Sequence, residues 1–458
     1  MIRAARLALL ALLAALLPLA LADARIAASS YGRSTAHFEL FAGAASLAAA
    51  LWAALELRAR RVRTLGEVVP IAAPLLVALA YATLLGEHPR RPFDYDCYEY
   101  AGRALLLGAN PWVAGLNYLY PPLTAQAFAL AHRGLFALAA WLGAAAGADA
   151  VWDLIFYLFQ CAQLGLVLLL HALCVRLVGA VGLDAARAHA LVALLLLVDN
   201  PLLRTLRHGQ LNLWILDAAL LALLTARRRP ALAGAALALS IHLKLYPLVL
   251  LLPLALARCG RAIAWTGAAL AGIALLQTDL GRDWTLWLQF ADYYRGQFPG
   301  EIAFRNNGFH SLAFNTLRFA TGAAPAELRA PLRAASGAFA LAVAVWLGLR
   351  CLARERRGLG TDAAAPGSAP PAELRLCANG ADALACSLLI SQSVWEHHFV
   401  FALPLMLLGA AWRGRERPGA LALAGLLVFG LPTFDLFPLS YHRAAGLLLL
   451  LGLTRPPR

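Results

Sequence analysis

Apolar blocks recur along the whole chain at lengths that suit helices in a bilayer. The hydrocarbon core of a membrane is about 30 Å thick, so a helix that crosses it needs roughly 20 mostly apolar residues. The pattern predicts an all-α polytopic membrane protein with about 12–14 transmembrane helices, some of them half-length or re-entrant. The predicted spans are residues 7–22, 38–57, 68–86, 151–175, 188–202, 211–226, 230–242, 246–257, 262–279, 331–352, 378–395, 399–412, 419–434 and 441–454.

The charge pattern indicates how these helices are oriented. The formal net charge of +14 comes from arginines that lie between apolar blocks, where they set membrane orientation, so we expect a lipid bilayer and no nucleic acid as partner. With the N-terminus in the cytoplasm, every basic cluster falls on the inner side, and both termini are predicted to be cytoplasmic. The clusters are Arg58–Arg63, Arg176, Arg227–Arg229, Arg258/Arg261, Arg350–Arg357, Arg413–Arg417 and Arg455/Arg458.

The same pattern divides the chain into regions. Residues 1–22 carry Arg3 and Arg6 before an apolar run, as a signal peptide does, but we expect a retained helix because many spans follow and the topology closes with it. The predicted organisation is residues 1–67 as N-terminal transmembrane helices, 68–357 as the core, 358–375 as a Gly/Pro/Ala-rich cytoplasmic linker, and 376–458 as C-terminal transmembrane helices.

Polar segments gather on the opposite, outer side in this topology. They are residues 87–150, 198–212, 244–247, 279–328, 395–399 and 436–443. Segments that meet on one side of a helix bundle predict an active site at its outer surface. For a protein of the inner (plasma) membrane, that surface is periplasmic or extracytoplasmic.

Lys244 is the single lysine of the chain and interrupts an apolar run. An ionisable group inside a span costs about 2.5–3.5 kcal/mol on insertion scales and indicates function unless the side chain snorkels to the interface. Arginines flank residues 230–257 at both ends, so the run must be a hairpin with "KLYP" at its outer tip. Pro247 supports this prediction because it disfavours helical geometry at Tyr246.

The first outer segment concentrates acids beside tyrosines. Asp94 and Asp96 lie near Tyr98, and "YPP" begins at Tyr120. A carboxylate here could deprotonate a hydroxyl nucleophile, hold a divalent metal together with its neighbour, or be a solvated surface group. The two aspartates share a side in an extended segment but not in a helix.

Amides and histidines supply further candidates. Gln210 and Asn212 enter an apolar span, where amides bind substrate or join helices, and Asn307 and His310 belong to an outer loop. The adjacent histidines of "WEHHF", His397 and His398, could contact a phosphate, shuttle protons or hold a metal. Neighbours on a helix diverge by about 100° and chelate poorly together, so we favour polar contacts to a substrate. The seven cysteines lack CxxC or CxxH spacing, which indicates neither a disulfide framework nor a zinc site.

In order along the chain, these segments resemble glycosyltransferase family 87 of the GT-C superfamily, which includes polyprenyl-phosphate-mannose-dependent mannosyltransferases and related arabinofuranosyltransferases. The matching segments are "DYDCY", "GANPW", "YPP", "GQLN", "KLYPL", "NGFHSL" and "WEHH", over about residues 92–410. The chain departs from the pattern in "DYDCYE", where Glu99 stands in place of a second tyrosine, and in "SQSVW" before the histidines.

The resemblance implies a GT-C-type bundle and a membrane glycosyltransferase of the cell envelope. It would move a hexose, mannose in the first place, or a pentose from a polyprenyl-phosphate sugar to a hydroxyl of a glycolipid or glycan, in one inverting step without a metal or other cofactor. The resemblance assigns Asp94 as the base and the basic residue of "KLYP" as the contact to the donor phosphate, and it places the paired histidines in the lining of the site.

The remaining roles follow from this assignment. Lys244 is the first candidate for the cation at the donor phosphate, with Arg207, His397 and His398 in support. A lipid-linked-sugar flippase or secondary transporter is the alternative, but such proteins show repeated halves, and the sequence has no convincing internal repeat. The predicted substrate-binding residues are Asp96, Tyr98, Tyr120, Gln210, Asn212, Tyr246, Asn307 and His310.

Overall fold

The computed structural model describes residues 64–86, 91–113, 118–143, 147–296, 306–324, 326–357, 371–413 and 437–453, together with residues 429 and 431. All regular structure in these ranges is helical, which confirms the predicted all-α class. The predicted spans 7–22 and 38–57, most of the span 419–434, and linker residues 358–370 lie outside the described residues.

The helices of the described residues follow the apolar blocks in order, and further helices form in the polar segments between them. Their bounds are α3 Leu65–Gly86, α4 Phe93–Leu106, α5 Pro122–Trp141, α6 Ala148–Gly179, α7 Ala185–Val198, α8 Asn200–Arg207, α9 Asn212–Thr225, α10 Pro230–Leu243, η1 Tyr246–Leu250, α11 Leu251–Leu256, α12 Gly260–Gln277, α13 Thr285–Gly296, α14 Phe309–Thr321, α15 Arg329–Arg357, α16 Pro371–Ile390, η2 Glu396–Ala402, α17 Leu403–Arg413, η3 Leu439–Tyr441 and α19 His442–Leu453.

Three described helices are long and apolar enough to cross a membrane: Gly66–Leu85, Ala148–Gly179 and Arg329–Arg356. The pair α7 and α8, bent by 60° at Asp199, would make a fourth span if it is a single broken one. Shorter apolar helices make up much of the remaining bundle, at Asn212–Thr225, Pro230–Leu243, Tyr246–Leu256 and Glu396–Ala411. The chain is therefore a helical membrane protein.

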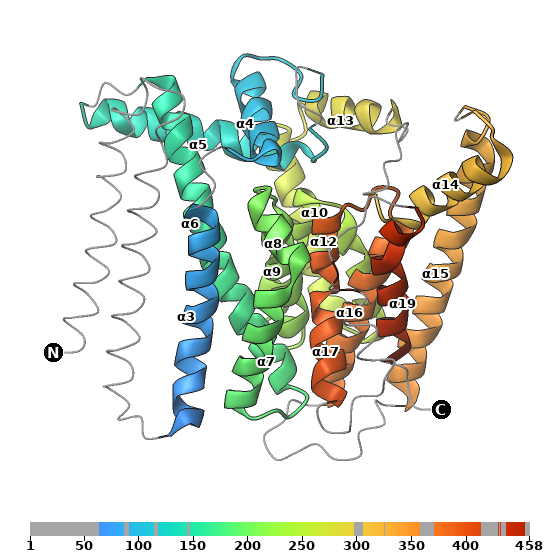
Figure 1. Ribbon diagram of the computed structural model, residues 1–458. Helices are drawn as coiled ribbons and strands as arrows, with labels where there is room; N and C mark the ends of the chain where they lie inside the picture. The colour runs from blue at the N-terminus through green and yellow to red at the C-terminus, as the bar shows by residue number, and fades with distance from the viewer. Residues whose placement is uncertain are drawn as a thin grey trace.

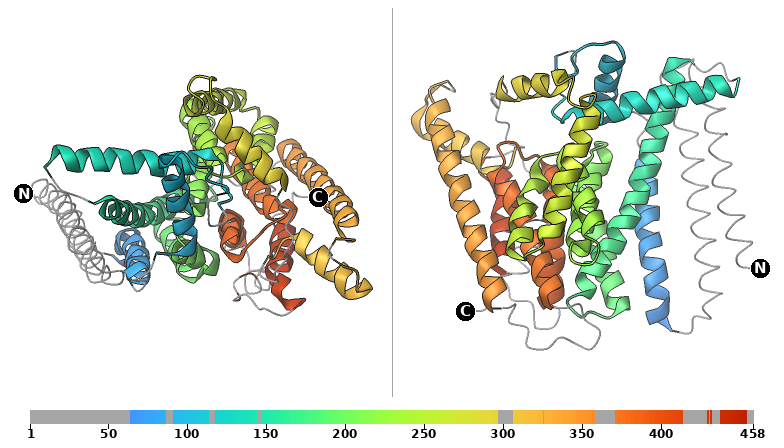
Figure 2. Two further views of the ribbon diagram at one scale, coloured as in Figure 1. Left: turned by 90° about the horizontal axis from the view of Figure 1, so that it is seen from above. Right: turned by 180° about the vertical axis from the view of Figure 1, so that it is seen from behind.

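The outer segments are more helical than the sequence suggested. Residues 87–150, expected as a loop, contain α4 and α5, and residues 279–328 contain α13 and α14. Figure 1 shows α4, α5 and α13 together at one end of the bundle, and Figure 2 shows α5 and α13 lying across that end. Residues 371–375, predicted as linker, begin α16, where Pro371 suits the first helical turn because its missing N–H has no partner to lose there.

Close helix contacts and buried ion pairs hold the bundle together. On α10, a Cβ at Gly234 would lie 2.5 Å from Trp265 Cβ, so the absence of a side chain lets α10 approach α12. Between α15 and α16, Asp382 Oδ2 lies 2.5 Å from Arg350 Nε and 2.7 Å from Arg354 Nη1, and all three side chains are buried. These two arginines, which the charge bias assigned to the cytoplasmic side, join two helices through their side chains.

Candidate active site

Helix α4 presents Asp94 to the interior of the end of the bundle that holds α4, α5 and α13. Asp94 and Asp96 both lie in its first turn, and because the segment is helical they point about 200° apart. Tyr98 lies one turn after Asp94 on the same face, which directs these two side chains to one place.

Asp94 faces a polar cluster from other helices. The Gln210 side chain lies beside the Asp94 carboxyl group, and His208 and Lys244 lie near enough to act on it electrostatically. Burial is the dominant influence and raises the pKa of Asp94 above its ordinary value, although the Gln210 contact and the two basic neighbours lower it. A carboxylate with a raised pKa in a polar cluster is suited to accept a proton.

Two tyrosines orient the Gln210 amide. The Tyr120 hydroxyl donates to Gln210 Oε1 over 2.6 Å, and the Tyr98 hydroxyl donates to Tyr120 over 2.9 Å and lies 3.5 Å from Gln210 Oε1. With its oxygen engaged by hydroxyl groups, Gln210 has its NH₂ group left to donate to the carboxylate of Asp94. Three of the predicted substrate-binding residues thus form one network beside the predicted base.

The turn between α8 and α9 depends on Gly209. Its φ of 64° is left-handed, which glycine adopts without steric cost. A Cβ there would lie 3.1 Å from Tyr95 Cβ and 3.3 Å from Pro92 Cγ, so only glycine lets this turn pack against the start of α4. The backbone oxygen of Gln210 accepts a bond of 2.8 Å from Gln163, which fixes the turn to α6.

Lys244 lies where α10 ends. Its backbone is extended, with φ −163° and ψ 140°, and η1 begins at Tyr246, so the chain breaks at the "KLYP" segment as the sequence predicted. Lys244 Nζ donates to Asn212 Oδ1 over 3.2 Å and lies 2.7 Å from His398 Nε2. It also lies over the rings of Tyr120 and Tyr246, at 5.5 and 5.1 Å from their centroids, so aromatic faces help to hold the cation.

The paired histidines take different neighbours. The His398 ring meets Lys244, whereas the His397 ring lies 5.9 Å from that of His208. The backbone oxygen of His397 accepts bonds from Thr205 Oγ1 over 3.0 Å and Asn212 Nδ2 over 3.3 Å. The two rings nevertheless meet edge-on, with 4.4 Å between their centroids, so the divergence expected for adjacent α-helical residues is not found in the 3-10 helix η2. Among the described residues, no three His, Cys, Asp or Glu side chains are grouped as metal ligands.

Glu396 is a central contact residue that sequence reasoning did not include in the site. Its Oε1 accepts from Arg443 Nη2 over 2.8 Å and from Asn200 Nδ2 over 2.9 Å, and its Oε2 lies 3.5 Å from Arg204 Nε. It joins α8 and α19 at the point where η2 starts. Its place beside the histidines, together with an arginine in the polar segment 436–443, was the available signal.

Four predicted residues lie away from the Asp94–Lys244 cluster. Arg207 is exposed, Asp96 lies on the Arg91 and Glu99 side of α4, and His310 Nδ1 is 2.8 Å from Ser336 Oγ on α15. Asn307 donates its backbone N–H to Val394 O over 2.7 Å and thereby supports the segment before the histidines. Burial and Glu99 raise the pKa of Asp96 to about 6. The contacts of these four residues with the substrates stay predictions.

Tyr246 supports the same segment from the "KLYP" side. Its hydroxyl donates to Ser393 O over 2.7 Å and accepts from Ser391 Oγ over 2.9 Å, and its ring meets that of His398 edge-on at 5.5 Å. Five separate parts of the chain therefore converge at one site. They are α4, residues 118–120, the α8–α9 turn, the end of α10 and η2.

Comparison with known proteins supplies an independent line of evidence. The sequence model of glycosyltransferase family 87 matches residues 118–365. Two curated proteins are named polyprenol-phosphate-mannose-dependent alpha-(1-2)-phosphatidylinositol mannoside mannosyltransferase. That of Mycolicibacterium smegmatis is 28% identical over 389 residues, 80% of each chain, and that of Mycobacterium tuberculosis is 29% identical over 398 residues, 79% of this chain and 81% of its own. No solved structure matches the chain.

Proposed function

The chain belongs to glycosyltransferase family 87 and is a glycosyltransferase, and on that premise we propose that it transfers mannose from a polyprenyl-phosphate donor to a hydroxyl of a glycolipid or glycan acceptor. The donor is proposed from the names of the two mycobacterial relatives. The acceptor class is proposed on the same ground, with a phosphatidylinositol mannoside as the first candidate. The single observation that carries the mechanism is that residues far apart in the sequence meet in one polar cluster beside Asp94: Tyr120 donates to Gln210 over 2.6 Å, and Lys244 Nζ lies 5.5 Å from the centroid of the Tyr120 ring.

The proposed reaction is a one-step inverting substitution. Asp94 takes the proton of the acceptor hydroxyl while that oxygen bonds to the anomeric carbon. The bond from the anomeric carbon to the phosphate oxygen breaks on the opposite side, and polyprenyl phosphate leaves with the electron pair. The Gln210 side chain supports this role because its NH₂ group can orient the carboxylate.

The leaving phosphate gains negative charge, and fixed cations and donors stabilise it best in a poorly hydrated site. We propose Lys244 as the main cation, with His398 and Asn212 as the groups that hold its ammonium in place. His397 and the exposed Arg207 complete the proposed phosphate-binding set. The proposed reaction uses no metal or other cofactor, since the charge on the phosphate is met by these side chains.

The architecture proposed for this activity is a GT-C-type bundle with its site on the outer face of the inner (plasma) membrane. The gathering of α4, α5 and α13 at one end supports such a face, and the charge bias of the sequence assigns it to the extracytoplasmic side. We keep the organisation into an N-terminal pair of helices, a core, a cytoplasmic linker and C-terminal helices as part of the proposal.

The test is transfer by the purified full-length protein in proteoliposomes. Polyprenyl-phosphate mannose and the corresponding arabinose donor, each labelled in the sugar, are supplied separately with a phosphatidylinositol mannoside. We expect mannose label to leave the polyprenyl lipid and appear on the acceptor, with and without a metal chelator. Movement of intact labelled donor across the bilayer without its cleavage would instead indicate the flippase, and release from the arabinose donor alone would replace mannose by a pentose.

A further inference from the structure

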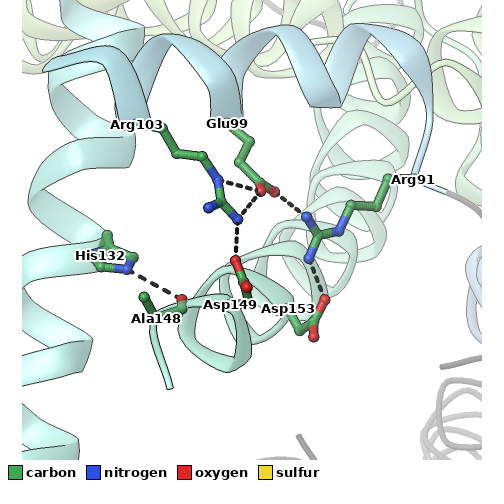
Figure 3. A network of polar contacts seen from close by, with 7 residues as sticks. All are labelled: Arg91, Glu99, Arg103, His132, Ala148, Asp149 and Asp153. Atoms are coloured by element: carbon green, nitrogen blue, oxygen red, sulfur yellow. Dashed lines mark hydrogen bonds and ion pairs between the residues drawn. The ribbon is translucent and has the colours of Figure 1, made fainter. Parts of the chain in front are cut away.

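Helix α4 has a second polar face that the proposed reaction does not use. Glu99 and Arg103 lie one turn apart on it, away from the face that carries Asp94 and Tyr98. Figure 3 shows Arg103 between Glu99 and Asp149, and Arg91 between Glu99 and Asp153, so that one chain of charges joins the start of α6 to the residues around α4.

Glu99 is the centre of this chain. Its Oε2 lies 2.5 Å from Arg91 Nη1, and its Oε1 accepts from Arg103 Nε over 2.9 Å. Its side chain is only 4% exposed, so both oxygens of a buried carboxylate are satisfied by guanidinium groups. Such charge-assisted bonds are stronger and more directional than neutral ones.

The two arginines carry the connection to α6. Arg91 also bonds to Asp153 through Nη2, and Arg103 Nη2 lies 2.9 Å from Asp149 Oδ1. The Arg103 guanidinium lies over the Trp152 ring at 5.1 Å from its centroid. Three residues in the first two turns of α6, Asp149, Trp152 and Asp153, therefore hold α4 from the side opposite the site.

Apolar contacts also hold α4, since the Tyr95 ring meets Phe128 and Phe156 edge-on. Both bonds of Glu99 lie within residues 91–103, and they orient the two guanidinium groups that reach Asp153 and Asp149 on α6. Asp94 lies five residues from Glu99 on the same rigid helix, so its distance to Gln210 and Lys244 depends on where α4 is seated.

We propose that Glu99 is a positioning residue: the chain Arg91–Glu99–Arg103 seats α4 on α6 and thereby places the Asp94 carboxylate for proton transfer. This role rests on the proposed function for its kinetic consequence, although the seating of α4 can be measured without it. Glu99 touches no substrate in this assignment. It acts through the position of Asp94.

The kinetic test compares Glu99→Gln, which keeps the shape and removes the charge, with Glu99→Asp, which keeps the charge. We expect kcat of Glu99→Gln to fall about tenfold, since small displacements of a reacting group are costly. The donor KM should stay within about twofold, because Lys244 and His398 belong to other elements. Glu99→Asp should recover most of kcat. If Glu99→Gln folds poorly, Arg91→Gln takes its place, and we expect its kcat to fall as well.

Glu355→Gln is the matched control. Glu355 is a partly buried acid on α15 that pairs with Arg375 and accepts from Asn379, far from α4 in the bundle. The Glu355→Gln variant loses an ion pair with an arginine, as Glu99→Gln does, and its kcat should equal that of the unmodified protein. An equal loss of kcat in Glu355→Gln, or a donor KM that rises in step with the fall in kcat of Glu99→Gln, would overturn the positioning role.

Cys97 supplies a readout that needs no activity. It belongs to α4 and its side chain is buried, 5% exposed. Its alkylation by a maleimide in membranes, followed by mass spectrometry of the Cys97 peptide, therefore reports how firmly α4 is seated. We expect severalfold faster alkylation in Glu99→Gln and no change in Glu355→Gln. Unchanged alkylation in Glu99→Gln contradicts the seating itself, whereas an unmodified protein that transfers no sugar contradicts only the proposed function.

Discussion

Lys244 Nζ and His398 Nε2 lie 2.7 Å apart, although 154 residues separate them in the chain. Two positive charges at this distance would repel strongly, so the pair carries at most one. The contact joins the "KLYP" break to the paired-histidine segment. A bound anion would be stabilised by the positive charge that the pair carries. The phosphate of a lipid-linked sugar would be such an anion.

Replacing Lys244 should therefore impair the handling of the donor. In Lys244→Ala we expect kcat/KM for the polyprenyl-phosphate donor to fall about 10²–10³-fold, the range found when one preorganised group opposite developing charge is removed. Lys244→Arg keeps the charge but not the compact ammonium, so it should be only partly active. Donor turnover and affinity that survive in Lys244→Ala would make the residue structural.

Asp94→Asn should separate catalysis from stability. Loss of the base should reduce transfer about 10²–10⁴-fold. Because burial raises the pKa of Asp94, its charged form is unfavourable in the folded protein, and the amide should leave the thermal midpoint in detergent unchanged or raise it. Asp96→Asn, on the opposite face of α4, is the comparison and should retain kcat within about fivefold. Full transfer by Asp94→Asn would remove the base assignment.

The pH dependence of both quantities follows from the same group. A general base works when deprotonated, so kcat/KM should rise with pH through the raised pKa of Asp94 and then level off. For stability the sign is opposite: the folded state binds this proton more tightly than the unfolded state, so the contribution of Asp94 improves as pH falls through the folded pKa. Rate profiles and thermal midpoints of the unmodified protein and Asp94→Asn give both curves, and an acidic limb that persists in the variant would assign it to another group.

Glu396 should matter for folding as well as for activity. Arg443 is fully buried, and Glu396→Gln removes the charge that it meets. Breaking a buried pair by removing one partner costs about 3–5 kcal/mol, so we expect a lower thermal midpoint and a displaced histidine segment. The exposed Arg228–Glu373 pair provides the control, since Glu373→Gln should cost about 1 kcal/mol or less. A double variant, Glu396→Leu with Arg443→Met, should be more stable than Glu396→Gln.

Some features of the site could be predicted from the sequence alone. Lys244 stood out because a charge in an apolar run has a large free-energy cost and persists only with a reason. The break in the chain before Pro247 followed from local backbone geometry, whereas the rings of His397 and His398, which were expected to diverge, meet edge-on. The all-α class followed from block length, since only helices satisfy their own backbone hydrogen bonds within a short apolar segment.

Other features had no local signal. Asp94 and Asp96 look equivalent in the sequence, and only the helical conformation of α4 directs one to Gln210 and the other to the Arg91 side. Arg91 could not be matched with Asp153, nor Glu396 with Arg443, because each pair joins segments whose relative placement depends on packing along the whole bundle. His310 was expected near the other polar groups but contacts Ser336.

The division has a physical cause. Hydrophobic period, charge cost and backbone stiffness are properties of neighbours along the chain, so the sequence alone determined the membrane class, the position of the breaks and the residue types able to do the chemistry. Which side chains touch is decided by helix contacts such as Gly234 against Trp265 and Gly209 against Tyr95, where a fraction of an ångström sets the packing. The partners of Asp94 and Lys244 were therefore fixed only by the tertiary structure.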